Sequence, residues 1–350
     1  MKESISKNPV LKPELLLPAG DMEKLKAAFT FGADAVYFAG ENFGLRAEQT
    51  SFSKDEMKEA MAYAHSLGKK AYVTVNSLAH EDDLQGLDAY ITFLESIAVD
   101  AVIVSDPGIL SRFRTLAPEI EIHISTQAST CNSASCKFWY DQGVKRVVLA
   151  RELSLSEIRQ IRANIPPDME LECFVHGAMC MAYSGRCLLS NVLTGRDANR
   201  GRCAQPCRWE WTLQTRGERD EIHVEEDSQG AYFFNSRDLC LIDHIPELLD
   251  AGINSLKVEG RMKGAFYVAT VAKNYRAALD AYLEDPEQYQ MNPLWREELD
   301  QMVHRTYDTG FYFDKPQEDP KVDLERSYHK EATVCGRVLE DGPERIYCSQ

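Results

Sequence analysis

The stretch AVIVSDPGILSRFRTLAPEIEIHISTQASTCNSASCKFWYDQGVKRVVL, residues 101–149, contains three short apolar runs separated by segments with a helical pattern. The runs are residues 101–104, 122–125 and 146–149. The first of these runs is apolar at every position, which is typical of a strand buried on both faces, as in a parallel sheet. This stretch therefore predicts repeated β/α units.

The same alternation extends through most of the chain. Eight runs read as strands: Leu15–Leu17, Ala35–Phe38, Ala71–Val75, Ala101–Val104, Ile122–Ser125, Arg146–Leu149, Leu171–Val175 and Ser255–Val258. Capping boxes indicate helix starts at Ser53 and Ser154, and Gly68 and Gly143 stand where helices should stop. Eight units within about 280 residues favour a closed (β/α)8, TIM-barrel-like fold over an open sheet.

The spacing of the runs also predicts the domain organisation. We expect a barrel over residues 1–310, interrupted by a cysteine-rich insertion at about 177–254, between the seventh and eighth strands. A loop after a barrel strand opens at the face where active sites lie. Within it, Ala231–Phe234 reads as a short strand. Residues 311–350 read as a linker and the start of a truncated or rudimentary C-terminal β domain, because Ala332–Val338 has a strand pattern.

Composition narrows the functional classes. The 350 residues carry a net charge of −16, which excludes a surface that is basic throughout. A local basic patch can still bind phosphates, although scattered arginines read equally well as a solvated face. The arginines that cluster are Arg186, Arg196, Arg200, Arg202 and Arg208. The N-terminus lacks the apolar region of a signal peptide, and no stretch is apolar enough to span a bilayer, so we expect a cytoplasmic protein without membrane contact.

Four cysteines form the strongest chemical signal, with the spacing Cys180-x6-Cys187-x15-Cys203-x3-Cys207. In a reducing compartment, clustered cysteines indicate a metal or catalytic site rather than disulfides. The first two spacings match neither a zinc ribbon nor a ferredoxin. Zinc, an iron–sulfur cluster and buried free thiols all remain open on spacing alone.

Polar residues follow or close many of the apolar runs, and in a barrel these strand ends converge on one pocket. We predict catalytic roles for His176, Lys257 and Glu259, and substrate-binding roles for Asn76, Asp106, Gln127, Arg151 and Arg261. As a set they describe a cation-rich pocket suited to a small anionic substrate. For any one of them, a helix cap or a hydrogen bond at the rim is an equally good interpretation.

Several segments resemble the collagenase-like peptidase family U thirty-two. They are FVHGAMCMAYSGRCLLS at 174–190, RGRCAQPCRW at 200–209, NSRDL at 235–239 and SLKVEGRMK at 255–263, and the likeness begins at PELLLPAGD, residues 13–21. The chain is most similar to the members that make 5-hydroxyuridine at the wobble position of tRNA. Other members hydroxylate a cytidine of 23S ribosomal RNA or act in ubiquinone synthesis.

The resemblance implies a cofactor, a co-substrate and partners. It implies a [4Fe–4S] cluster held by Cys180, Cys187, Cys203 and Cys207, with Cys240 as an alternative fourth ligand. It also implies prephenate as the hydroxyl donor, tRNA as the macromolecular partner, and a family paralogue or an electron donor as a further partner.

Three other functions are alternatives to tRNA hydroxylation. Hydroxylation of another substrate, such as a 23S rRNA cytidine or a ubiquinone precursor, would use the same centre. A collagenase-like peptidase could use Cys180 with His176, but a cluster ligand is not free to act as a nucleophile, and neither H-E-x-x-H nor G-x-S-x-G occurs in the sequence. The last alternative is a non-catalytic RNA-binding scaffold.

Overall fold

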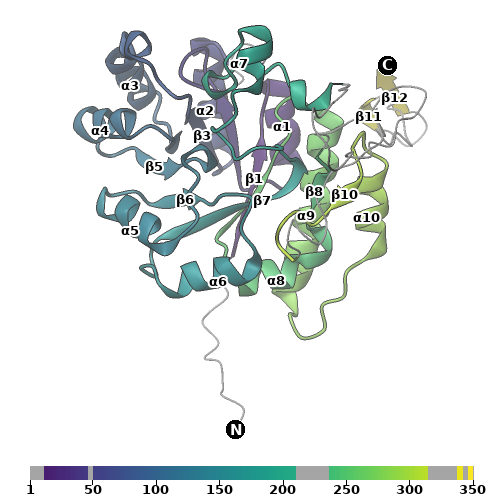
Figure 1. Cartoon of the computed structure of the whole chain (residues 1–350). Helices are drawn as coiled ribbons and strands as arrows, with labels where there is room; N and C mark the ends of the chain where they lie inside the picture. Colours follow the sequence, from purple (N-terminus) through teal and green to yellow (C-terminus); the bar gives the residue numbers. More distant parts are fainter. Residues whose placement is uncertain (1–11, 46–49, 210–235, 314–336, 342–345, 350) are drawn as a thin grey trace, which may run out of the picture.

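The computed structural model describes residues 12–45, 50–209, 236–313, 337–341 and 346–349 (Figure 1). The strands are β1 Glu14–Pro18, β2 Ala35–Ala39, β3 Lys70–Val75, β4 Ala101–Val104, β5 Glu121–Ile124, β6 Arg146–Val148, β7 Glu170–Ala178, β8 Asp238–Cys240, β9 Ser255–Val258, β10 Tyr307–Asp308, β11 Arg337–Asp341 and β12 Ile346–Ser349. The helices are α1 Met22–Thr30, α2 Lys54–Ser66, α3 Leu87–Ser96, α4 Pro107–Leu116, α5 Ser133–Asp141, α6 Leu155–Ala163, α7 Leu189–Thr194, α8 Ile245–Asp250, α9 Ala265–Glu284 and α10 Pro293–Asp300.

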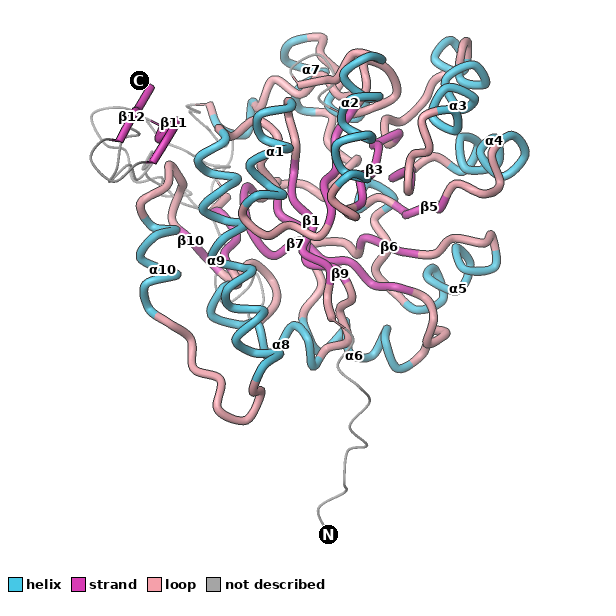
Figure 2. The backbone as a smooth tube through the Cα atoms, turned by 180° about the vertical axis from the view of Figure 1, so that it is seen from behind, coloured by secondary structure: helices cyan, strands magenta, loops and turns pink. Residues whose placement is uncertain are grey.

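Eight parallel strands close into a barrel, which confirms the predicted fold class. Strands β1 to β7 pair in chain order, and β9 then pairs with both β7 and β1 to close the ring. Helices surround the strands (Figures 1 and 2). All eight predicted runs coincide with barrel strands, since the last of them is β9.

Local sequence signals account for the helix ends. Ser53 and Ser154 each form a complete capping box, as predicted, at the start of α2 and of α6. Gly68 and Gly143 follow the ends of α2 and α5 with φ of 65° and 77°. That left-handed backbone conformation is favourable for glycine alone, so these two residues end the helices and turn the chain toward the next strand.

The two faces of the barrel strands differ in composition. The outward side chains, such as Leu15, Leu17, Val36 and Val102, pack against the helices in one continuous apolar core. The inward apolar side chains form a second, small cluster of Leu16, Ala35, Tyr37, Tyr72, Ala101 and Ile103. Burial on both faces explains why the strands read as apolar runs.

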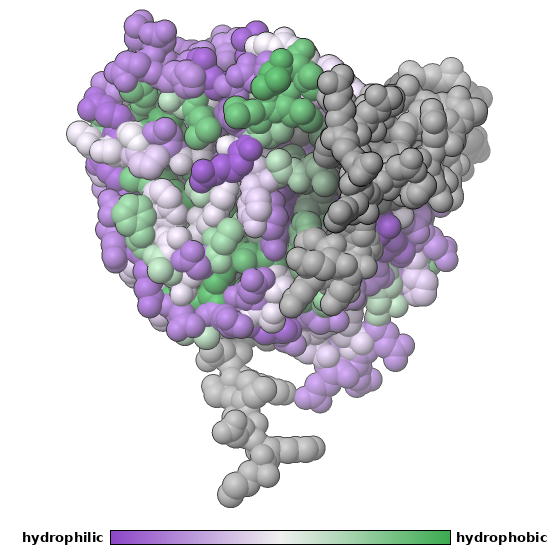
Figure 3. Space-filling view, viewed as in Figure 1, coloured by the Kyte–Doolittle hydropathy of each residue, from purple (hydrophilic) through white to green (hydrophobic). Residues whose placement is uncertain are grey.

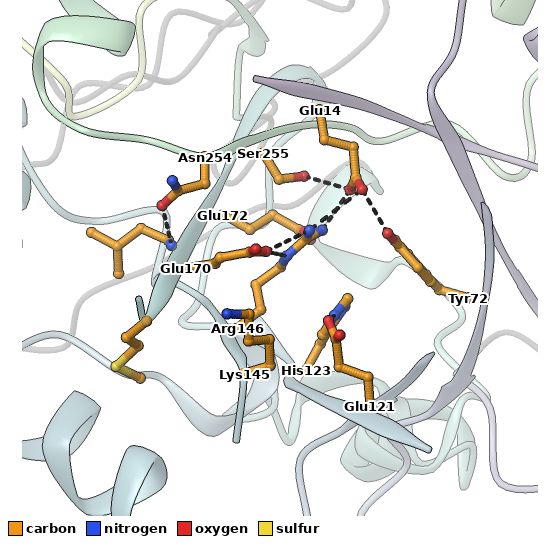
Figure 4. Close-up of polar contacts among 12 residues, drawn as sticks. Glu14, Tyr72, Glu121, His123, Lys145, Arg146, Glu170, Glu172, Asn254 and Ser255 are labelled. Carbon is orange, nitrogen blue, oxygen red and sulfur yellow. Dashed lines mark hydrogen bonds and ion pairs between the residues drawn. The ribbon is translucent and has the colours of Figure 1, made fainter. Parts of the chain in front are cut away.

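Charged groups fill much of the remaining interior (Figure 4). Arg146 from β6 is 3% exposed and forms ion pairs with Glu14, Glu170 and Glu172. Barrel interiors are usually packed with branched aliphatic residues, so an ionic network here is a departure that needs complete pairing. Tyr72 supplies further pairing by donating a hydrogen bond to Glu14 over 2.6 Å.

The end of β7 leaves the barrel. Phe174 is opposite Lys257 of β9, but His176 is opposite Val258, so Val175 is an extra residue at a bulge. Beyond the bulge, residues 176–178 pair antiparallel with β8, and β8 pairs with β10. β8 and β10 therefore extend the sheet beside the barrel, starting from the end of β7.

Part of the predicted organisation is not tested. The Ala231–Phe234 strand and the beginning of the Ala332–Val338 strand lie outside the described residues, whereas Arg337 and Val338 start β11, which pairs with β12. The boundaries at 177–254 and 311–350 stay predictions. Within the described ranges, no helix has the length and apolarity needed to cross a bilayer.

Candidate active site at the mouth of the barrel

A cavity of about 470 Å³ opens at the C-terminal ends of the barrel strands. Its inner wall includes Tyr37 of β2, Thr74 of β3, Phe174 of β7 and Lys257 of β9. Residues 178–189 and parts of 198–208 form its outer wall. The volume lies in the range of ordinary small-molecule sites, and the position is the one barrel enzymes use.

Six of the eight residues predicted for catalysis or substrate binding line this cavity. They are Asn76, Gln127, Arg151, Lys257, Glu259 and Arg261. They come from loops or strand ends at β3, β5, β6 and β9, which the closed barrel brings together. These six residues therefore share one cavity, as the convergence of strand ends in a closed barrel predicts, and their roles in catalysis and substrate binding stay predictions.

Lys257 is held on the inner wall by charge and by aromatic rings. Its Nζ atom is 2.7 Å from Oε1 of Glu172 and lies 4.5 Å from the centre of the Tyr37 ring. Burial lowers the pKa of Lys257, and the neighbouring Glu172 carboxylate opposes that shift. The carboxylate thus favours the ammonium form in a site where desolvation disfavours it.

Glu172 connects Lys257 to the network in the barrel interior. Its side chain is fully buried, and its second oxygen accepts a 3.0 Å hydrogen bond from Arg146. Burial alone would raise the pKa of Glu172, but Lys257 and Arg146 outweigh burial and lower it. Glu172 therefore remains a carboxylate between two cations, one facing the cavity and one facing the other end of the barrel.

Two arginines supply further positive charge at the cavity. Arg151 donates hydrogen bonds to the Ala178 carbonyl at 3.0 Å and to the Ser184 hydroxyl at 2.8 Å, and its guanidinium lies 5.2 Å from the centre of the Phe174 ring. Arg261 is 7% exposed and donates to Oγ1 of Thr74 over 3.4 Å. Both guanidiniums are thus fixed beside aromatic or hydroxyl groups of the cavity wall.

The side-chain amides of Asn76 and Gln127 differ in how completely they are hydrogen-bonded. Asn76 donates to the Ser125 hydroxyl and accepts from the backbone N–H of Leu45, at 3.1 and 3.2 Å. Oε1 of Gln127 is buried and has no hydrogen-bond partner within the described parts of the chain. A buried unsatisfied amide oxygen is costly, which is a common mark of a site completed by a ligand or water.

His176 does not line the cavity, contrary to the expectation that it shares the pocket with Arg151 and Lys257. Its imidazole is buried in the helix layer beside Tyr275 and Tyr307, with each hydroxyl 3.4 Å from a ring nitrogen. Burial lowers the pKa of His176 to about 3. The bulge at Val175 is the physical reason, because one extra residue turns the next side chain to the opposite face of the strand.

Asp106 is also placed away from the cavity. Its carboxylate is the N-cap of α4 and accepts hydrogen bonds from the backbone N–H groups of Gly108 and Ile109, at 2.7 and 3.1 Å. The side chain thus satisfies two donors that a helix start leaves without partners. The structure supports the interpretation of Asp106 as a helix cap rather than a substrate ligand.

Cys180, Cys187, Cys203 and Cys207 all line the cavity, on its outer wall. Burial raises the pKa of the Cys207 thiol, Arg208 opposes the shift, and the three other cysteines raise it further. Among the described residues, no group of three or more histidines, cysteines or carboxylates is close enough to hold a metal ion. Four thiols on one cavity wall therefore suit a thiolate-bound metal centre in their chemistry and their location. Their sulfur atoms are not grouped closely enough to coordinate one ion.

Cys240 lies elsewhere. It is 2% exposed in β8, where it is opposite His176 in the sheet, and it is absent from the cavity wall. Burial raises the pKa of its thiol to about 11. Of the two candidates for a fourth ligand, Cys207 shares the cavity with the other three cysteines and Cys240 does not.

The cysteine segment is fixed to the rim of the barrel at several points. The backbone N–H of Leu78 donates to the Asn199 carbonyl, and the Asn199 amide donates to the Cys187 carbonyl, at 3.0 and 3.1 Å. Arg200 forms an ion pair with Asp83 in the β3–α3 loop. On the other side, the Ser129 hydroxyl donates to the Ser184 carbonyl over 3.2 Å. These contacts hold the segment over the strand ends.

Sequence reasoning missed the residues that support Lys257 from inside the barrel. Glu172, Arg146, Tyr37 and Phe174 lie within the predicted strands, and the sequence pattern assigns them no separate role. A signal was present, since LECFV at 171–175 has a carboxylate in the middle of a buried strand. A charge in that position needs a buried partner of opposite sign, and Lys257 and Arg146 are the cations that pair with it.

Comparison with known proteins gives consistent results. Residues 20–321 match the description "Peptidase family U32". The "tRNA hydroxylation protein P1" of Bacillus subtilis is 45% identical over 94% of this chain and 77% of its own length. An "Uncharacterized protease" of Methanocaldococcus jannaschii is 44% identical over 86% and 73%, and the "tRNA hydroxylation protein P" of Escherichia coli is 39% identical over 86% and 75%. The extent of these matches shows that the chain belongs to peptidase family U32.

Proposed function

We propose that this protein is an enzyme that hydroxylates RNA, most specifically uridine at C5 in the wobble position of tRNA, with prephenate as the hydroxyl donor. The observation that carries the proposal is the cavity at the barrel mouth, where cationic side chains and four cysteines line a common space. Two relatives at 45% and 39% identity are named for tRNA hydroxylation, which supports RNA as the substrate class.

The cations suit the proposed donor. Arg151, Lys257 and Arg261 come from three places on the cavity wall, and guanidinium and ammonium groups bind carboxylates through charge-assisted hydrogen bonds. Prephenate has two carboxylates and an unsaturated ring. The rings of Tyr37 and Phe174, which also line the cavity, provide apolar surface for such a ring.

The cysteines suit the proposed cofactor. Cys180, Cys187, Cys203 and Cys207 would hold a [4Fe–4S] cluster, because four thiolates are the usual ligand set for that cluster. Bound there, the cluster would supply one-electron redox chemistry at the outer wall of the cavity. Arg151 and Arg208 lie near two of these cysteines and would offset the negative charge that four thiolates bring.

The reaction sets requirements on the residues of the cavity. Replacing hydrogen on the base by hydroxyl oxidises the base by two electrons, so the donor must be reduced by two electrons as it gives up its oxygen. Among the described residues that line the cavity, Glu259 is the one with a carboxylate, and it would accept the proton that leaves the base. Lys257, held by Glu172, and Arg261, held by Thr74, would orient the donor.

Proteolysis is the second candidate, because the family carries a peptidase name and one relative is called an uncharacterized protease. The proposed Cys180–His176 dyad is not supported by the structure. Cys180 faces the cavity, whereas His176 is buried among the side chains of α9 and β10. A thiol nucleophile needs a base within hydrogen-bond reach, and His176 is turned away from the cavity.

Deletion of the gene tests the two candidates together. Loss of 5-hydroxyuridine-derived nucleosides from bulk tRNA, read by mass spectrometry, is expected if the protein hydroxylates tRNA. The purified protein should then leave gelatin and short peptides intact. Unchanged tRNA nucleosides, in a strain without other family members, together with peptide cleavage that Cys180→Ala abolishes, would reject the proposal in favour of proteolysis.

A further inference from the structure

The outer rim of the cavity exposes apolar side chains. Met181, Tyr183 and Leu188 line the cavity, yet their side chains are 45%, 48% and 64% exposed. Val192 and Leu193 of α7 extend this surface, and Figure 3 shows hydrophobic residues gathered over α7 at the top of that face. Apolar surface that is contiguous and borders a cavity marks a binding site more often than chance exposure does.

The segment that forms this rim is rich in arginine, although the chain as a whole is acidic. Residues 177–209 contain five arginines and one acidic residue, Asp197, whereas the whole chain has a net charge of −16. The Asp197 carboxylate accepts a 2.9 Å hydrogen bond from the backbone N–H of Asn199. Arg186 is exposed and lines the cavity between Tyr183 and Leu188 in the sequence. The partner that fits this rim is an anion that also presents flat apolar faces.

Single-stranded nucleic acid has both properties. Its phosphates pair with arginines, and its bases stack on aromatic side chains, in a manner that depends little on sequence. A folded protein partner would match the apolar side chains but would not require the local excess of guanidinium groups. The cavity directly behind the rim gives a second reason, because enzymes that modify a base move it out of the stack into such a pocket.

The wall of the cavity offers a group that could read an extruded base. Oε1 of Gln127 is buried without a hydrogen-bond partner among the described residues, and it lies against Gly185 on the rim segment. A carboxamide both donates and accepts, so it can pair with the hydrogen-bonding edge of a pyrimidine. This unsatisfied amide is an independent indication that a polar ligand completes the site.

We propose that an unpaired segment of the substrate RNA docks on Met181, Tyr183 and Leu188, with Arg186 on its phosphates and one base extruded past Tyr183 toward Gln127. The inference rests on the proposed function, because it takes RNA as the substrate. It adds the surface that holds the strand, the requirement for an unpaired nucleotide, and Tyr183 as the stacking platform.

Binding measurements with anaerobically purified, iron-loaded full-length protein test this surface. The probe is a fluorescent anticodon stem-loop RNA with an unpaired uridine, and a blunt duplex of the same length is the comparison. Tyr183→Ala should weaken stem-loop binding by about tenfold or more, because one base stack is lost. Tyr183→Phe retains the ring and should bind like the unmodified protein.

Matched variants separate docking from general effects. Phe31→Ala removes an aromatic ring of similar exposure, 44%, at the end of α1, on the opposite face of the barrel, and should leave binding unchanged. Arg186→Ala should reduce the dependence of affinity on salt by about one phosphate contact. Arg112→Ala, at an exposed arginine on α4, should not. Thermal unfolding identifies any variant that fails to fold. If Tyr183→Ala is one of them, the salt dependence of binding by Arg186→Ala decides.

Four outcomes would overturn the inference. Equal affinity of Tyr183→Ala and Phe31→Ala for the stem-loop would remove Tyr183 from the interface while leaving RNA hydroxylation intact. Equal affinity of the unmodified protein for the duplex would remove the requirement for an unpaired nucleotide. Loss of self-association in Tyr183→Ala, with unchanged RNA affinity, would make the rim an interface between two copies. If the protein neither binds nor modifies tRNA, both the inference and the proposed function fail.

Discussion

Replacing Arg146 with alanine should destabilise the barrel more than any replacement at a surface ion pair. Arg146 is 3% exposed and holds three carboxylates, of which Glu172 is fully buried (Figure 4). Removing one partner of a buried ion pair leaves an uncompensated charge in a poorly polarisable interior and costs about 3–5 kcal/mol. Because Lys257 still pairs with Glu172, we expect a cost near the lower limit of that range, about 3 kcal/mol.

Urea unfolding followed by circular dichroism measures this effect. Arg112→Ala is the matched control, since Arg112 pairs with Asp88 on the surface and both side chains are well exposed. Such exposed pairs contribute about 0–1 kcal/mol, so the midpoint for Arg146→Ala should fall several times further than that for Arg112→Ala. Equal midpoint shifts for the two single alanine variants would refute this account of the interior.

Three further predictions concern the site. Cys207→Ala should lose bound iron whereas Cys240→Ala should keep it, because Cys207 shares the cavity with the other cysteines; iron retained in the first and lost in the second would reverse the ligand assignment. Lys257→Ala or Arg261→Ala should weaken prephenate binding, measured by calorimetry, by about tenfold or more while iron content stays constant, and unchanged affinity would reject the donor site. Glu172→Gln should weaken the loss of unfolding free energy at acidic pH. The pKa of Glu172 is lowered in the fold, because Lys257 and Arg146 outweigh burial. The carboxylate therefore stabilises the fold above its unfolded pKa of about 4.3, and this contribution is lost as the pH falls through the folded pKa. An acid limb that is the same with and without the carboxylate would contradict this assignment.

The sequence predicted the barrel well because each strand is buried on both faces and is bounded by strong helix signals. The capping boxes at Ser53 and Ser154 and the left-handed glycines Gly68 and Gly143 are local features, so they can be read without tertiary information. The convergence of Asn76, Arg151 and Lys257 followed from topology alone, since parallel strands of a closed barrel end at one face.

Predictions failed where a tertiary feature decided the outcome. His176 follows an apolar run like the other site residues, but the bulge at Val175 turns its side chain into the helix layer. No local signal in LECFVHGA marks that bulge, because it depends on pairing with both β9 and β8. The roles of Glu172 and Arg146 were missed for a similar reason, since a charge in a buried strand is interpretable only once its partners from other strands are known.

The most direct test of RNA hydroxylation is to follow the oxygen atom. Anaerobically purified protein, supplemented with extract from a strain lacking family members, is incubated with undermodified tRNA and with prephenate carrying oxygen-18 in its hydroxyl group. We predict 5-hydroxyuridine in the digested tRNA with oxygen-18 in place of oxygen-16, and none with Cys180→Ala protein. Unmodified uridine at the wobble position, or 5-hydroxyuridine formed equally well with Cys180→Ala protein, would contradict the account.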